Sequence, residues 1–119
     1  MELDKEAILK ANDKTIVKIN VPEWGGDVYI TVMSGTQRDD WEQSCWDGEK
    51  RVLKNMRAKM LVKCMCNSEG KLIFTHSDMD KLGAKSSKIL NRIFEQACKL
   101  NKLTDKDVEE LEGNLRGTS

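Results

Sequence analysis

The stretch ILNRIFEQACKL, residues 89–100, places its apolar residues at the three- and four-residue spacing of an α-helix. They fall in two adjacent columns: Ile89, Ile93, Ala97 and Leu100 in the first, and Leu90, Phe94 and Cys98 in the second. An apolar stripe of this width covers more of a helix than one contact in a small domain usually needs. We therefore expect one column to face a protein partner, with the alternative that both columns close the core.

The segments on either side of this helix carry start and stop signals. Ser86 or Ser87 can cap its beginning, and after its end residues 104–111 predict a second, acidic helix. The last seven residues are small and polar. We predict a single domain over residues 1–112 and a flexible polar tail over residues 113–119.

The β-rich part of the sequence lies N-terminal to these helices. Residues 15–21 are rich in β-branched side chains, residues 22–27 (PEWGGD) supply a turn, and residues 28–33 alternate as a returning strand. Residues 3–10, before this hairpin, are expected to form either a short helix or an irregular N-terminal segment. Residues 72–74 can add a third strand. The expected fold class is α+β, with a small N-terminal antiparallel hairpin or sheet followed by a predominantly helical part.

Shorter helices are predicted between the hairpin and the C-terminal helix. Thr36, with Asp39 three residues later, resembles a capping box and predicts a helix over residues 37–45. Ser77, with Asp80 three residues later, repeats this signature before a short helix that ends near Gly83.

A longer helix, predicted over residues 50–66, carries the case for a nucleic-acid partner. Its cations Lys54, Arg57, Lys59 and Lys63 follow Lys50 and Arg51 with no acidic residue among them, so they could track a phosphate backbone. No aromatic residue lies between Trp46 and Phe74 to stack on single-stranded bases. A small regulator that binds nucleic acid through residues 50–63 is therefore the alternative, and a solvated or partner-facing helix the preferred interpretation.

The amino-acid composition limits which partners and which cellular compartment are expected for the protein. Twenty acidic and twenty basic residues balance, so no global field draws the protein to nucleic acid or membrane. The charged N-terminus and the lack of any apolar run near ~20 residues predict neither a signal peptide nor a membrane span. We expect the four cysteines, Cys45, Cys64, Cys66 and Cys98, to be reduced thiols in the cytoplasm.

Catalytic and metal motifs are weak in this sequence. His76 is the single histidine, and its neighbours Ser77 and Asp78 do not make a triad, since triads join groups distant in sequence. One residue separates Cys64 from Cys66, whereas structural zinc sites favour two to four. We expect no catalytic residue, cofactor or metal and no enzyme activity, and leave open whether this thiol pair binds a metal.

A tryptophan in the hairpin turn adds one more candidate for partner binding. Trp24 precedes two glycines, and an exposed aromatic ring at a turn is a natural anchor for a partner. The candidate partner-binding residues are Ile89, Ile93, Phe94, Ala97, Leu100 and Trp24.

The order of several segments resembles a known family. These segments are residues 21–30 (VPEWGGDVYI), 38–42 (RDDWE), 57–62 (RAKMLV), Phe74 with Ser77 and Asp78, residues 90–95 (LNRIFE) and 100–104 (LNKLT). Together they resemble the tail assembly chaperones of lambdoid long-tailed bacteriophages, the siphoviruses. The similarity covers residues 15–112, and the order of the segments carries it rather than any single motif.

This resemblance implies a non-enzymatic assembly factor in the host cell cytoplasm. Such proteins bind the tape measure protein, keep it soluble, help recruit tail tube subunits and are absent from the mature virion. The family often makes a longer form by ribosomal frameshifting near the end of the gene, and the tail from Gly113 is a place where an extension could begin. Many copies along one client would also permit self-association.

Overall fold

The computed structural model describes residues 1–103 of the chain. A three-stranded antiparallel sheet has its strands in the order β1-β2-β5. β1 (Ile16–Val21) and β2 (Gly26–Thr31) form the hairpin, and β5 (Met65–Cys66) pairs with the other edge of β2. Val17 lies opposite Ile30, so alternate apolar side chains of the hairpin share the face that packs on the core.

The hairpin forms because strand and turn signals agree. Its connection is a single 3-10 turn, η1 (Pro22–Trp24), which begins with proline and ends at Gly25. Gly25 has a φ of +82°, a left-handed conformation that glycine adopts without steric cost. The predicted hairpin and the α+β fold class are confirmed.

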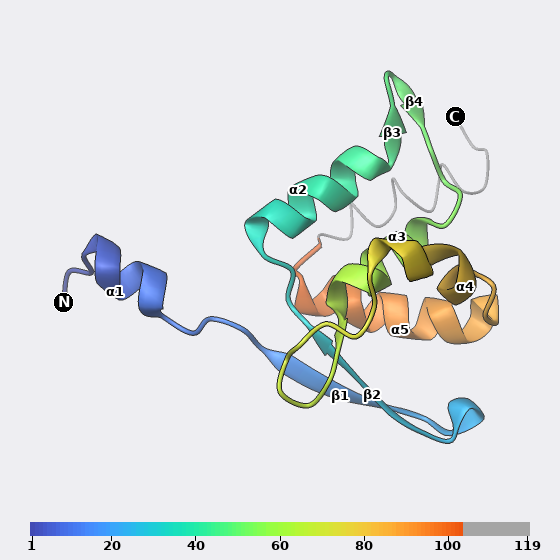
Figure 1. Ribbon diagram of the computed structural model, residues 1–119, viewed down its shortest axis with the longest axis horizontal. Helices are drawn as coiled ribbons and strands as arrows, with labels where there is room; N and C mark the ends of the chain where they lie inside the picture. Colours follow the sequence, from blue (N-terminus) through green and yellow to red (C-terminus); the bar gives the residue numbers. More distant parts are fainter. Residues whose placement is uncertain (104–119) are drawn as a thin grey trace.

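Helices make up most of the remaining chain. They are α1 (Lys5–Lys10), α2 (Gly35–Ser44), α3 (Met56–Cys64), α4 (Met79–Gly83) and α5 (Ser87–Leu100), with a 3-10 turn η2 (His76–Asp78) before α4. Helices α2 to α5 gather on one side of the hairpin, whereas α1 projects beyond the sheet at the N-terminal end of the chain (Figure 1). The predicted acidic helix over residues 104–111 and the polar tail lie outside the described residues.

The core lies where α3 and α5 pack together over the sheet. Met60 and Leu61 of α3, Ile93 of α5 and Ile30 of β2 are fully buried. Burying each of these side chains contributes roughly 1.5–3 kcal/mol relative to leaving it in water. The spacing of apolar residues on α3 and α5 therefore fixes how both helices sit on the sheet. Among residues 1–103, no helix is long and apolar enough to cross a bilayer.

The predicted helix over residues 50–66 is wrong in its first third. A two-stranded ribbon of β3 (Trp46–Asp47) and β4 (Lys50–Arg51) occupies that region, and Gly48 takes a φ of +63° in its turn. The Val52 amide donates to the Cys45 carbonyl at 2.7 Å, which extends the ribbon toward the end of α2. Helix α3 begins only after Asn55, whose left-handed backbone breaks any continuation from the N-terminal side.

Two capping assignments shift toward the N-terminus. Ser34, not Thr36, caps α2: the Gln37 amide donates to Ser34 Oγ at 3.1 Å, and Gln37 Oε1 accepts from the Ser34 amide at 2.8 Å. Before α4 the reciprocal pair is Thr75 with Asp78, not Ser77 with Asp80. Both helices exist near their predicted places, and only the starting turns differ.

The third strand also differs from its predicted position. It is β5, formed by Met65 and Cys66, whereas Leu72 makes only an isolated bridge back to Cys66. Asn67 explains the change, because its side-chain oxygen accepts from the amides of Glu69 and Lys71 and turns the chain sharply after β5.

Candidate protein-interaction surfaces

The two apolar columns of α5 both lie in the hydrophobic core. Ile93 and Ala97 are fully buried, and Phe94 and Ile89 expose only 4% and 8% of their surface. Leu100, at the last turn, is half-buried against the same core. The expectation that one column faces outward is therefore wrong, because α3 and β2 pack against α5. That these residues contact a partner stays a prediction, and such contact would require α5 to leave the core.

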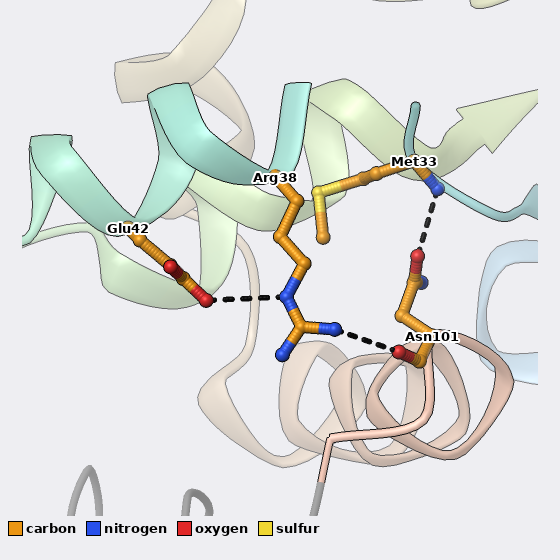
Figure 2. A network of polar contacts seen from close by, with 4 residues as sticks. All are labelled: Met33, Arg38, Glu42 and Asn101. Atoms are coloured by element: carbon orange, nitrogen blue, oxygen red, sulfur yellow. Dashed lines mark hydrogen bonds and ion pairs between the residues drawn. The ribbon is translucent and has the colours of Figure 1, made fainter. Parts of the chain in front are cut away.

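Asn101 joins the end of α5 to the corner between β2 and α2 (Figure 2). Its side-chain oxygen accepts from the buried Met33 amide at 2.7 Å, and its nitrogen donates to the Ala97 carbonyl at 2.8 Å. The Arg38 side chain donates to the Asn101 carbonyl at 3.1 Å and to Glu42 Oε1 at 3.1 Å. A cation at the C-terminal end of a helix also complements the helix dipole. This network joins three elements: the contacts of the Asn101 side chain are buried, whereas the Arg38–Glu42 pair is exposed to solvent.

Trp24 lies at the tip of the hairpin and is half-buried against the core. Next to it, Glu23 accepts two hydrogen bonds from Arg92 of α5, each 2.8 Å long. The Arg92 guanidinium lowers the pKa of the Glu23 carboxyl to about 2. The turn that carries Trp24 is thus tied to α5, and part of the indole remains accessible to a partner.

The basic residues of the predicted helix do not form one cationic face. Lys54 precedes α3, Arg57 donates to Asn91 on α5 at 2.9 Å, and Lys59 donates to the Ser44 carbonyl at 2.9 Å. Arg57 also lies over the Phe94 ring, 5.6 Å from its centre. Two of these cations therefore hold α3 against its neighbours, and Lys63 follows at the end of the helix. The continuous basic helix over residues 50–63 that the nucleic-acid alternative needs does not exist.

All four cysteines are buried, and none of them is part of a disulfide. Burial raises the pKa of Cys64 to about 12, and it also raises the pKa values of Cys45 and Cys66. Asn101 lies 3.7 Å from the Cys64 sulfur. Within residues 1–103, no cluster of three or more side chains of the metal-ligating kind comes together. The buried cysteines therefore act as small apolar side chains of the core.

A small cavity opens between the first turns of α3 and α5. Its volume is about 150 Å³, and its lining includes Leu53, Arg57, Lys85 and Leu90. Pockets for drug-sized ligands are about 300–1,000 Å³, so this one suits a single side chain rather than a cofactor.

Exposed apolar side chains gather in three other places. The N-terminal arm, residues 1–15, exposes Leu3, Ile8 and Leu9 by 59%, 58% and 75%. The second place is the sheet surface turned away from the helices, where Ile16 and Leu72 are each 38% exposed. Ile73, beside Leu72, is 52% exposed. The third place is the β3–β4 ribbon, where Trp46 is 47% exposed. Sequence reasoning missed these surfaces, although isolated apolar residues among charges at the N-terminus were a visible signal.

Comparison with known proteins assigns the family. The family model described as phage tail assembly chaperone matches residues 5–114. The chain belongs to the phage tail assembly chaperone family. The resemblance noted from the order of the sequence segments is thereby confirmed, and with it a role in phage tail assembly.

A solved structure shares the fold of this tail assembly chaperone. The tail assembly chaperone of bacteriophage HK97 superposes with a TM-score of 0.60 at 18% sequence identity, over 84% of this chain and 95% of that one. No curated protein sequence matches the chain. The family role is one of assembly rather than catalysis, which directs attention to the exposed surfaces.

Proposed function

We propose that this tail assembly chaperone binds the tape measure protein of its phage, keeps that long protein soluble, and helps recruit tail tube subunits around it. It acts in the host cell cytoplasm and is absent from the mature virion. A longer form of the chain, made by ribosomal frameshifting near the end of the gene, acts beside it. Membership of the family and the separate patches of exposed apolar side chains support this role.

The observation that carries client binding is the pair Trp46 and Arg51 on the β3–β4 ribbon. The ribbon projects from the helical side of the molecule (Figure 1). Its Trp46 ring is 47% exposed, and the guanidinium carbon of Arg51 lies 4.5 Å from the ring centre. Arg51 Nε is buried and has no hydrogen-bond partner within residues 1–103. Tryptophan and arginine are the residues most enriched among interface hot spots, so the ribbon is a strong candidate for client contact.

The chemistry of this pair specifies the client. The exposed indole offers a large apolar contact at small conformational cost, and the arginine beside it offers planar donors to a carboxylate. An amphipathic helix with an apolar side chain next to an acidic one meets both requirements. A tape measure protein that is helical over most of its length presents many such sites, so several chaperone copies can bind one client.

Co-expression with a fragment of the tape measure protein tests the proposal. We expect the wild-type chain to move the fragment from the insoluble to the soluble fraction and to co-purify with it. Trp46→Ala, which removes an exposed side chain, should reduce capture by tenfold or more while the circular dichroism spectrum stays unchanged. A hot-spot side chain accounts for about 2 kcal/mol or more, which corresponds to at least this loss.

Ile73→Ser provides the matched control, since it also removes an exposed apolar side chain but lies on the loop after β5. Capture should persist in this variant. Equal capture by Trp46→Ala and wild type would remove the ribbon from the proposal. A fragment that stays insoluble with the wild-type chain would overturn client binding itself.

A further inference from the structure

We propose that the acidic segment of the chain, residues 104–112, docks on the Trp46 face of the β3–β4 ribbon in the same molecule and competes there with the client. The Trp46 face is defined by Trp46 and Arg51, which lie opposite each other in the ribbon. The inference rests on the proposed function, because it assigns a regulator to the surface proposed above for the tape measure protein. The acidic segment covers this surface until a client displaces it.

The Trp46 face carries a positive charge that no neighbour neutralises. Asp47 lies opposite Lys50 in the ribbon, so these two opposite charges offset each other, and Glu49 lies beyond them in the turn. Asp47 and Lys50 point to the side away from Trp46, since side chains alternate along a strand. Among the described residues Arg51 has no salt bridge, and its Nε is buried without a hydrogen-bond partner.

A second cation lies at the base of the ribbon. Burial raises the pKa of the Cys45 thiol, whereas Lys59 and Arg51 lie close enough to this thiol to lower its pKa. Glu42 also acts on the thiol, but its carboxylate is paired with Arg38 at 3.1 Å. Two cations at the base of the ribbon therefore meet a carboxylate that already has a partner. An acidic partner fits this place.

The acidic segment has the chemistry that the Trp46 face requires. Its one basic residue is Lys106, and its carboxylates are those of Asp105, Asp107, Glu109, Glu110 and Glu112. In the helix predicted for this segment, Val108, Leu111 and Glu112 lie on one side, because they are spaced by three and four residues. That side presents two apolar side chains next to a carboxylate, which is the pattern expected of a client helix on the ribbon.

The described chain ends at a point from which the acidic segment can reach the ribbon. Leu103 packs against the core, and the Asn101 carbonyl accepts from Arg38 near the start of α2. Helix α2 leads from there to the ribbon (Figure 1). The part of α2 that follows Arg38 rises about 9 Å, whereas residues 104–112 span about 14 Å as a helix and about 30 Å when extended. The segment is therefore long enough to follow α2 to the Trp46 face.

Tethering makes a weak contact sufficient for regulation. A segment joined to its site by a short connection has an effective concentration of roughly millimolar. If it covers the Trp46 face in about three-quarters of the molecules, the apparent affinity for a client falls about fourfold. A long client with many sites overcomes this loss through avidity, whereas a short apolar helix of an unrelated protein does not.

Nuclear magnetic resonance of the whole isotope-labelled chain tests the contact without any client. The probe is the indole N–H resonance of Trp46, assigned with Trp46→Phe, and the resonances of Trp24 and Trp41 are internal references. We expect Val108→Ser/Leu111→Ser to shift the Trp46 resonance and to leave the other two in place. The shift should be the same at low and at high protein concentration, because the contact lies within one molecule.

Leu115→Ser is the matched control, since it also removes an apolar side chain but lies beyond the acidic segment. All three indole resonances should keep their wild-type positions in this variant. Capture of the tape measure fragment tests the regulation on the same proteins. Val108→Ser/Leu111→Ser should bind the fragment about fourfold more tightly than the wild type, and Leu115→Ser should match the wild type.

The outcomes separate this inference from the proposed function. A Trp46 resonance unchanged in Val108→Ser/Leu111→Ser would overturn the contact, even where Trp46→Ala abolishes capture and client binding stands. A shift that appears only at high concentration would place the contact between neighbouring chains and overturn the inference as well. Equal capture by this variant and the wild type would overturn the regulation. A wild-type chain that captures no fragment would overturn the proposed function, and the Trp46 resonance would still decide the contact.

Discussion

Arg92 and Glu23, 69 residues apart in sequence, form a pair of parallel hydrogen bonds, each 2.8 Å long. Arg92 lies on α5, and Glu23 lies in the turn at the tip of the β1–β2 hairpin. Both side chains keep about 40% of their surface exposed. The pair therefore ties the far end of the hairpin to the principal core helix across the surface of the molecule.

This pair predicts a pH-dependent contribution to stability. The pKa of Glu23 falls from 4.5 to about 2 on folding, chiefly because Arg92 donates hydrogen bonds to the carboxylate. The folded state then favours the charged form, so the contribution is complete above about pH 4.5 and is lost as the pH falls toward 2. We expect Glu23→Gln to lower the urea midpoint at pH 7 and to match the wild type near pH 2. Glu49→Gln, on the β3–β4 ribbon, is the control, and a difference that persists unchanged at pH 2 would contradict the assignment.

The Asn101 network predicts a larger loss of stability. Asn101→Ala leaves the buried Met33 amide without its acceptor, and an unsatisfied buried donor costs about 1–3 kcal/mol. The free energy of unfolding, measured in urea, should fall by about that amount. Asn20→Ala removes an exposed amide from the hairpin and should change stability by less than about 0.5 kcal/mol. Equal effects of the two substitutions would show that the network contributes little.

The burial of both α5 columns predicts how its residues respond to truncation. Ile93→Ala should cost about 2–5 kcal/mol, since it leaves a cavity in a fully buried site. Leu100→Ala, at a half-buried position, should cost distinctly less. Chemical denaturation of both variants makes the comparison, and a near-neutral Ile93→Ala would restore the hypothesis that its column faces outward.

The buried thiol of Cys64 predicts sensitivity to high pH. Burial raises its pKa from 9.0 to about 12, so the folded state favours the neutral thiol. Stability from this group is complete below about pH 9 and falls as the pH rises from 9 toward 12, because the unfolded chain releases the proton first. Alkylation of Cys64 at pH 8, followed by mass spectrometry of its peptide, should be at least tenfold slower in buffer than in urea. Equal rates would contradict the burial.

The hairpin and α5 could be predicted because their signals are local. Alternating β-branched residues, a Pro and two glycines specify the hairpin within 16 residues of sequence, and two apolar columns specify a helix. The ribbon at residues 46–51 could not, since Lys50 and Arg51 are good helix formers on their own. Contacts with Trp46 and with the end of α2 override that propensity.

The candidate surfaces were harder to predict than the fold. A wide apolar stripe on α5 indicates burial, but the sequence does not say how much of it the sheet and α3 can cover. Trp24 and Trp46 look alike in sequence, yet the first packs against the core and the second is exposed. That difference depends on where two separate turns lie in space, which no local pattern records.

The position of Asn101 has a consequence for the order in which the molecule is made. Met33 and Asn101 are separated by 68 residues, so the β2–α2 corner has no acceptor for its buried amide until nearly the whole described domain has been synthesised. The Met33 amide can therefore gain its acceptor only late in translation, after residue 101 has been made. Because residue 101 precedes residue 113, a ribosome that changed frame at or after that point would already have delivered every group that this hydrogen bond needs. Any frameshifted product of the kind proposed above would then share this folded body with the shorter chain and differ from it only in its C-terminal residues.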